Sequence, residues 1–198
     1  RIHGVAIESA DLHSILDAFA PYFEKGQITY EAFVDGVAYG GREYVEHPEA
    51  FGVPERNVAY VQSTRKPVDD IIAFLSEHEE ELDSLDIVAA DTALYQKIEE
   101  QIPLVTKSVY TTSAVSYRLE ISHKNSGKAT GLAYVLKLLD ITPEETVAFG
   151  DGDNDAEMLE FAGLGVAMEN ATENCKAAAD IVCDCCKNDG VARFLYGF

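Results

Sequence analysis

A short apolar run followed at once by a cluster of acidic and amide side chains is the feature that most limits how this chain can fold. The run Thr146–Phe149 is of the kind that forms a buried strand in a parallel sheet. It is followed by Gly150-Asp151-Gly152-Asp153-Asn154-Asp155, whose glycines let the backbone turn sharply. Because ligands bind at the carboxyl ends of strands in open parallel sheets, the sequence predicts a ligand site at residues 150–155.

Carboxylates this close together repel one another unless a cation neutralises them. Mg²⁺, which takes oxygen ligands and keeps several waters, suits such a loop. A calcium loop of the EF-hand type is excluded, because Ala156 stands where that loop needs glycine and Ala162 where it needs glutamate. A polar surface turn is the remaining alternative, although such a turn rarely needs this many carboxyl and amide groups in succession.

The spacing of apolar residues divides the chain into two parts. From Lys128 onward, helices and strands alternate as they do in α/β proteins. Residues 9–121 instead predict the order α-β-β-α-β-α-β-β, which is typical of helices packed on a mostly antiparallel sheet. The first helix of the second part has its apolar side chains on one face. These residues are Leu132, Val135, Leu136 and Leu139.

Three prolines mark boundaries in the first part. Pro48 and Pro54 indicate a loop, and Pro67 is predicted to begin a helix at its first turn.

The charge balance excludes several classes of partner. The chain has 35 acidic and 15 basic residues, which gives a formal net charge of −20. Nucleic acid and anionic lipid are repelled by such a chain, because phosphate contacts need clusters of lysine and arginine. A membrane span is not expected either, since no run of about 18 apolar residues exists. A phosphate bound by such an acidic chain needs a metal or backbone N–H groups to offset its charge. The sequence leaves the oligomeric state open.

The four cysteines gather near the end of the chain, at positions 175, 183, 185 and 186. Cysteines so close together cannot cross-link a fold of this length, so we expect a reducing, cytoplasmic setting. On one interpretation the stretch Cys183-Asp184-Cys185-Cys186 forms half of a zinc site, but it lacks the C-x-x-C spacing of such sites. Small apolar residues at a strand end are the favoured interpretation.

The motifs of the second part resemble those of one enzyme family. Residues 150–155 resemble GDGxND, the fourth motif of the haloacid dehalogenase superfamily, and Lys128 resembles its third motif. Asn170-Ala171, Ala179-Asp180 and Asp189-Gly190-Val191 resemble the tail of its Cof-type sugar-phosphatase branch.

This resemblance implies an α/β fold in two domains. Residues 122–198 would form the C-terminal half of the family's Rossmann-like core. Residues 9–121, which match by element order alone, would form an α+β cap domain of the C2 type. Residues 1–8 would connect this cap to a missing part of the core.

The resemblance also implies a magnesium-dependent phosphatase that transfers a phosphoryl group through an aspartyl-phosphate. Its substrate would be a small phosphorylated metabolite, with a sugar phosphate expected. Asp151 would bind Mg²⁺, and Asp155 would share the ion or hold a coordinated water. Asn154 and Lys128 would bind the phosphate, with Lys128 as a catalytic residue that neutralises charge on the phosphoryl oxygens. Polar or aromatic candidates for substrate contact in the cap are Tyr30, Tyr39, Tyr44, Tyr60 and Arg65.

The sequence departs from the family at its first motif, because no D-x-D-G-T or D-x-D-G-V string occurs. The strings Asp35-Gly36-Val37 and Asp189-Gly190-Val191 lack the leading aspartate. We therefore expect a fragment without the nucleophile, inactive alone although its parent is an enzyme. The alternative is a non-catalytic fragment that binds metal or phosphate, or that regulates another protein.

Overall fold

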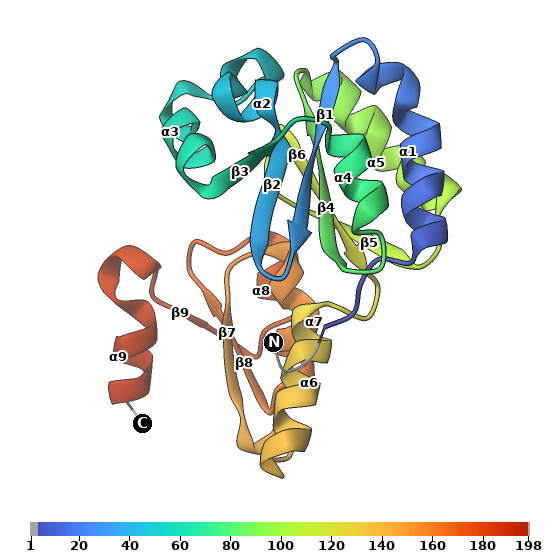
Figure 1. The fold of residues 1–198 in the computed structure, drawn as a ribbon. Coiled ribbons are helices and arrows are strands. Elements are labelled where there is room, and N and C mark those ends of the chain that lie inside the picture. Colours follow the sequence, from blue (N-terminus) through green and yellow to red (C-terminus); the bar gives the residue numbers. More distant parts are fainter. Residues whose placement is uncertain (1–3, 198) are drawn as a thin grey trace. The chain divides into compact units, whose positions relative to one another are not determined.

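The computed structural model describes residues 4–197 and divides into two compact units (Figure 1). The N-terminal unit ends at Lys124 and the C-terminal unit begins at Asn125. None of the helices in the described range is both long enough and apolar enough to cross a membrane.

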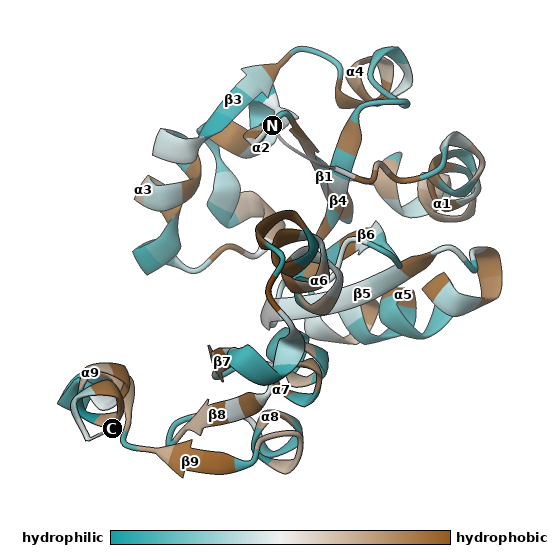
Figure 2. Ribbon diagram, turned by 90° about the horizontal axis from the view of Figure 1, so that it is seen from below, coloured by the Kyte–Doolittle hydropathy of each residue, from teal (hydrophilic) through white to brown (hydrophobic). Residues whose placement is uncertain are grey.

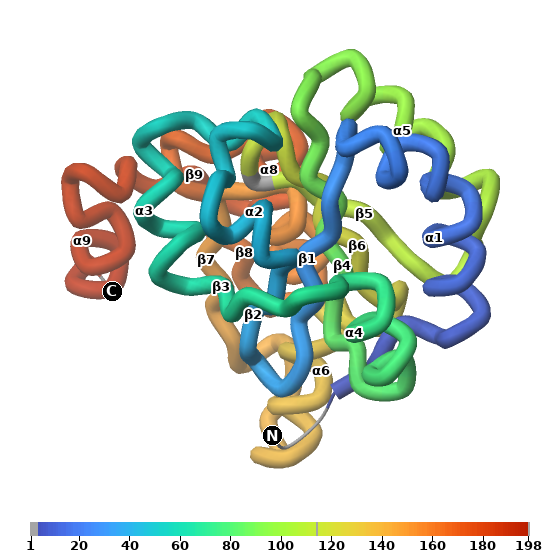
Figure 3. Tube along the Cα trace, turned by 45° about the horizontal axis from the view of Figure 1, so that its top comes forward, coloured from blue at the N-terminus to red at the C-terminus, as the bar shows by residue number. Residues whose placement is uncertain are grey.

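The N-terminal unit is built on a six-stranded sheet in the order β3-β2-β1-β4-β6-β5. Neighbouring strands are antiparallel except β2 and β3, which run parallel and lie side by side in Figure 3. This is the mostly antiparallel sheet that the sequence predicts. The strands are β1 (Ile28–Val34), β2 (Val37–Gly41), β3 (Arg65–Val68), β4 (Leu82–Ala89), β5 (Val109–Val115) and β6 (Arg118–His123).

Three helices cover one face of this sheet: α1 (Ser9–Phe23), α4 (Ile71–Glu77) and α5 (Thr92–Val105) (Figure 1). Their apolar faces pack on alternate strand residues, because successive side chains of a strand point to opposite faces. Tyr30, Ile87 and Leu119 are examples, each at most 1% exposed. The residues between them, such as Glu31 and Asp86, lie on the opposite face.

That opposite face carries a second, smaller apolar cluster. It joins α2 (Arg42–Glu46), the 3₁₀ turn η1 (Pro48–Phe51) and α3 (Glu55–Thr64) to Val88 of β4. The loop predicted with Pro48 and Pro54 is confirmed only for residues 52–54, because helices α2 and α3 and the turn η1 occupy the rest of the segment. Pro48 begins η1 and Pro54 directly precedes α3, and proline is accepted at such positions because the first turn of a helix leaves its N–H groups without partners.

The helix predicted to begin at Pro67 begins later. Pro67 lies in β3, an edge strand, where a missing N–H costs no ladder hydrogen bond on the outer side. Asp70 instead caps α4, because its side chain accepts hydrogen bonds from the backbone N–H groups of Ile72 and Ala73 at 2.9 and 3.0 Å.

The C-terminal unit contains a three-stranded parallel sheet in the order β7-β8-β9. Helices alternate with these strands, which confirms the α/β alternation predicted from Lys128 onward. The strands are β7 (Val147–Gly150), β8 (Leu164–Met168) and β9 (Ile181–Cys183). The helices are α6 (Lys128–Leu139), α7 (Ala156–Phe161), α8 (Glu173–Ala177) and α9 (Gly190–Tyr196), with 3₁₀ turns η2 (Pro143–Glu145), η3 (Asp153–Asp155) and η4 (Cys186–Asn188).

The apolar face of α6 is largely exposed within the described part of the chain. Leu136 is buried, but Val135 and Leu139 are 47% and 61% exposed. In Figure 2 much of the α6 ribbon and part of the β9 ribbon are coloured as hydrophobic, and in β9 Ile181 and Val182 are 41% and 51% exposed. Strand β7 is the edge of its sheet and pairs with β8 alone among the described strands.

Candidate functional site

The loop after β7 is tightly folded back on itself. A Cβ placed on Gly150 would lie 2.5 Å from Cβ of Asp155, a distance that real Cβ contacts do not reach. Gly152 is similarly close to Asn154, with a would-be Cβ 2.8 Å from Oδ1. Glycine at position 150 therefore lets the strand end directly against Asp155, and the short η3 turn completes the loop.

Asp155 is the residue around which this loop is organised. Its Oδ2 accepts hydrogen bonds from the backbone N–H groups of Asp151 and Gly152, at 2.9 and 3.0 Å. Its Oδ1 accepts one from Lys128. Burial by itself raises the pKa of the Asp155 carboxyl, but the hydrogen bonds from Lys128 and the two backbone groups outweigh this effect and lower the pKa. The side chain is thus held as a carboxylate although the residue is only 4% exposed.

Lys128 reaches this loop from the first turn of α6. Its Nζ contacts Asp155 and lies 3.3 Å from Oδ1 of Asn154. The Lys128 side chain remains 47% exposed. The structure therefore brings Lys128 together with Asn154, the two residues predicted to bind phosphate, and with Asp155, which was predicted to bind the metal.

Asp151 lies at the start of the loop with an exposed side chain. Its backbone carbonyl accepts the N–H of Thr172 at 3.0 Å, and its Oδ2 accepts a hydrogen bond from Nδ2 of Asn170 at 3.3 Å. These contacts fix the aspartate while leaving its carboxylate accessible to a ligand.

Two residues after β8, Asn170 and Thr172, complete the site, and neither was predicted from the sequence to take part in it. Asn170 binds Asp151, and Oγ1 of Thr172 donates a hydrogen bond to Oδ1 of Asp153 at 2.5 Å. Both follow the carboxyl end of the strand next to β7. In a parallel sheet adjacent strand ends meet at one edge, and this rule was the signal that could have identified them.

The oxygen atoms that the loop offers as metal ligands suit a hard cation. The side chains of Asp151, Asp153 and Asn154 are exposed and offer oxygen atoms, which Mg²⁺ prefers. Both oxygens of Asp155 already accept hydrogen bonds, so this carboxylate is better placed to hold a coordinated water than to bind the ion directly. Asp151 is therefore the candidate for direct coordination.

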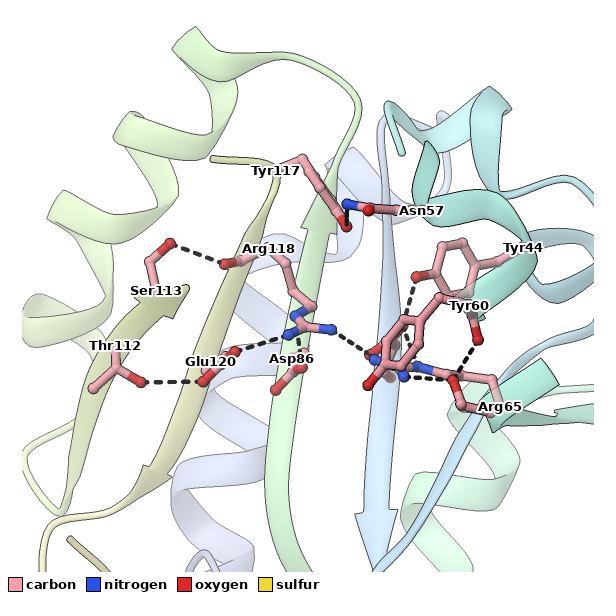
Figure 4. A network of polar contacts seen from close by, with 12 residues as sticks. Tyr44, Asn57, Tyr60, Arg65, Asp86, Thr112, Ser113, Tyr117, Arg118 and Glu120 are labelled. Atoms are coloured by element: carbon pink, nitrogen blue, oxygen red, sulfur yellow. Dashed lines mark hydrogen bonds and ion pairs between the residues drawn. The ribbon is translucent and has the colours of Figure 1, made fainter. Parts of the chain in front are cut away.

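The N-terminal unit carries a row of charged side chains on the face of its sheet opposite α1, α4 and α5 (Figure 4). Glu31 of β1 pairs with Asp86 of β4, which pairs with Glu120 of β6. Arg65 donates two hydrogen bonds to Glu31, at 2.9 and 2.8 Å. Arg118 contacts all three acids, with nitrogen-to-oxygen distances of 3.7 Å to Glu31, 3.3 Å to Asp86 and 2.9 Å to Glu120.

Most of the five cap residues suggested for substrate contact are instead packed against other residues of the N-terminal unit. Arg65 is buried against Glu31, and the Tyr44 hydroxyl donates to the same carboxylate at 2.5 Å. Tyr30 is fully buried in the core, and Tyr39 packs on Phe74 with ring centroids 4.5 Å apart. Among the five candidates Tyr60 alone is an exposed residue: it is 58% exposed, and its ring lies against the guanidinium of Arg65, while Tyr39 is half-buried.

Comparison with known proteins identifies the relatives of this chain. The family model of the haloacid dehalogenase-like hydrolases matches residues 3–195. Phosphatase YwpJ of Bacillus subtilis is 30% identical over 98% of this chain and 72% of its own length. A phosphoglycolate phosphatase of Methanopyrus kandleri is 50% identical over 80 residues, which are 40% of this chain and 34% of that protein.

The fold has solved counterparts. A haloacid dehalogenase-like hydrolase of B. subtilis superposes with a TM-score of 0.74 at 25% identity, over 98% of this chain and 72% of that one. The stretch matched in the Methanopyrus enzyme spans about a third of its length, so the activity of a whole enzyme does not pass directly to this chain.

Proposed function

The chain belongs to the haloacid dehalogenase-like hydrolases of the Cof type, and from this premise we propose that it carries the magnesium- and phosphate-binding half of a phosphatase site. The observation that carries the proposal is the joint anchoring of Lys128 and the acidic loop on Asp155. One cation site and one ammonium group would together offset a dianionic phosphate within an otherwise acidic protein.

Each residue has a distinct part in this proposal. Lys128 binds the phosphoryl oxygens and stabilises the charge that grows on them during transfer. Asn154 orients the phosphate through its exposed amide. Asp151 supplies the negative charge that holds the cation, while Asp155 keeps Lys128 and the loop in position. Mg²⁺, when bound, would act as the Lewis acid that polarises the phosphoryl group.

The proposed substrate is a small phosphorylated metabolite, and sugar phosphates are the first class to test. The phosphoglycolate phosphatase of Methanopyrus, by its name, acts on a small phosphate ester, which favours a substrate of this size. The N-terminal unit would act as the cap that selects the leaving group. The proposal assigns no aspartyl nucleophile to these residues, because the sequence contains no D-x-D-G-T or D-x-D-G-V string.

A non-catalytic metal- or phosphate-binding role is the competing proposal, and one assay separates the two. The full-length gene product is given a panel of sugar phosphates and phosphoglycolate, and inorganic phosphate release is measured with and without Mg²⁺. Release that needs Mg²⁺ and disappears in Asp151→Asn supports the phosphatase. Metal binding without any release would instead support the binding module.

A further inference from the structure

Three potential metal ligands lie together at the carboxyl ends of β8 and β9, outside the acidic loop. They are Glu169, the first residue after β8, and Asp184 and Cys185, which follow β9. One ligand atom from each of the three lies within 4.8 Å of the others. This spacing allows all three side chains to reach a single ion.

The ligand set differs in chemistry from the acidic loop. Cys185 offers a thiol, and thiolates select ions such as Zn²⁺ over Mg²⁺. Three protein ligands with one open position form a set that Zn²⁺ accepts in tetrahedral geometry. Two carboxylates and one thiolate carry three negative charges, which a divalent ion would reduce to one.

Hydrogen bonds from neighbouring groups hold one of the three potential ligands, Asp184, in place. Oδ1 of Asp184 accepts hydrogen bonds from the backbone N–H of Cys185 at 2.8 Å and from Nδ2 of Asn188 at 2.9 Å. Such outer contacts orient a ligating carboxylate. Arg193 lies 3.6 Å from Oδ2 of Asp184, but its side chain is 71% exposed, so this weak surface pair opposes an incoming cation little.

We propose that Glu169, Asp184 and Cys185 form a second metal site, selective for Zn²⁺-like ions, whose occupancy weakens Mg²⁺ binding at Asp151. The coupling passes through Asn170, the neighbour of Glu169. Nδ2 of Asn170 donates to Asp151 at 3.3 Å, and Oδ1 of Asn170 accepts the N–H of Cys186 at 3.2 Å. Glu169 and Cys185 are the sequence neighbours of Asn170 and Cys186. An ion bound by them places a second positive charge near the cation at Asp151 and disturbs the hydrogen bond from Asn170 to Asp151. This regulatory part rests on the proposed function of the Asp151 loop.

The site is tested by Co²⁺ titration of the chain with Mg²⁺ in excess and a reductant that contains no thiol. Cobalt bound by Cys185 gives a thiolate-to-cobalt charge-transfer band, which oxygen ligands alone do not produce. We expect the band in the wild type and in Cys186→Ser, its loss in Cys185→Ser, and at least tenfold weaker Co²⁺ binding in Glu169→Gln and in Asp184→Asn. Zn²⁺ should displace the cobalt.

Three results would overturn the site: no band in the wild type, a band that persists in Cys185→Ser, or a band lost in Cys186→Ser. The coupling is tested separately, by Mg²⁺ titration with and without Zn²⁺. Zn²⁺ should raise the half-saturating Mg²⁺ concentration severalfold in the wild type and leave it unchanged in Cys185→Ser. An equal Mg²⁺ titration in all cases refutes the coupling. A missing band beside intact phosphatase activity refutes this inference alone, and a band without phosphatase activity refutes the proposed function alone.

Discussion

Lys128 donates a hydrogen bond to Asp155 across 27 positions of sequence, and the same carboxylate folds the loop that begins at Asp151. The ammonium group that would meet the phosphate and the loop that would hold the cation therefore share one anchor. A change at Asp155 must move both, while a change at Lys128 leaves the backbone hydrogen bonds of the loop in place.

Replacement of Lys128 tests its part in phosphoryl transfer. In the full-length gene product, Lys128→Ala should lower kcat by on the order of 10²–10³, because a charge directed at the transition state is lost. Steady-state release of inorganic phosphate measures the effect. Lys137→Ala, an exposed lysine in the last turn of the same helix, is the matched control and should leave kcat unchanged. Similar losses in the two variants would mean that general surface charge matters, rather than the position of Lys128.

Replacement of Asp151 tests the cation site in the chain itself. Mg²⁺ at about 100 times its dissociation constant should stabilise the wild type by about 2.7 kcal/mol, and Asp151→Asn should remove this gain. Thermal unfolding with and without Mg²⁺ measures both. Glu157→Gln removes the same charge from an exposed position of α7 and should respond to Mg²⁺ as the wild type does. An unchanged Mg²⁺ response in Asp151→Asn would place the ion elsewhere.

Two glycines of the C-terminal unit should respond in opposite directions to the same substitution. Gly150→Ala forces a methyl group against Asp155 and should destabilise this unit by about 1–3 kcal/mol. Gly131→Ala, at the fourth residue of α6 with nothing within 4 Å of the new methyl, should stabilise it by about 0.5–1 kcal/mol. Urea unfolding of both variants measures the difference. A Gly150→Ala protein as stable as the wild type would show that the loop is not packed on Asp155 as described.

The parts of the structure that sequence predicted are those with local causes. The β7 strand, its acidic loop and the helix that begins at Lys128 each follow from a short pattern of apolar, glycine and carboxyl residues. The helix start predicted at Pro67 is wrong because proline is equally acceptable at a helix start and in an edge strand, and only the sheet order distinguishes the two. The partners of Asp86 could not be predicted at all, since they depend on the register of strands far apart in sequence.

Asp86 should make the stability of the N-terminal unit depend on pH. Burial and the neighbouring carboxylate of Glu31 raise the pKa of Asp86 well above its usual value, against the opposing effect of Arg118. A carboxyl whose pKa is raised by folding contributes most to stability below its unfolded pKa of about 3.9, and this contribution is lost as the pH rises through the folded value. The wild type should therefore lose stability as the pH rises above the unfolded pKa of Asp86, and the Asp86→Asn substitution should remove this loss.

Asp86→Asn should accordingly unfold at a higher urea concentration than the wild type at neutral pH, and the difference should shrink as the pH falls towards the unfolded pKa of the carboxyl, about 3.9. Tyrosine fluorescence follows this unfolding, because most tyrosines lie in the N-terminal unit. Asp17→Asn, which removes an exposed carboxyl from α1, is the control and should keep the pH profile of the wild type. If Asp86→Asn were instead less stable at neutral pH, the contact with Arg118 would outweigh burial and repulsion by Glu31, and the charged form of Asp86 would be the one that this sheet stabilises.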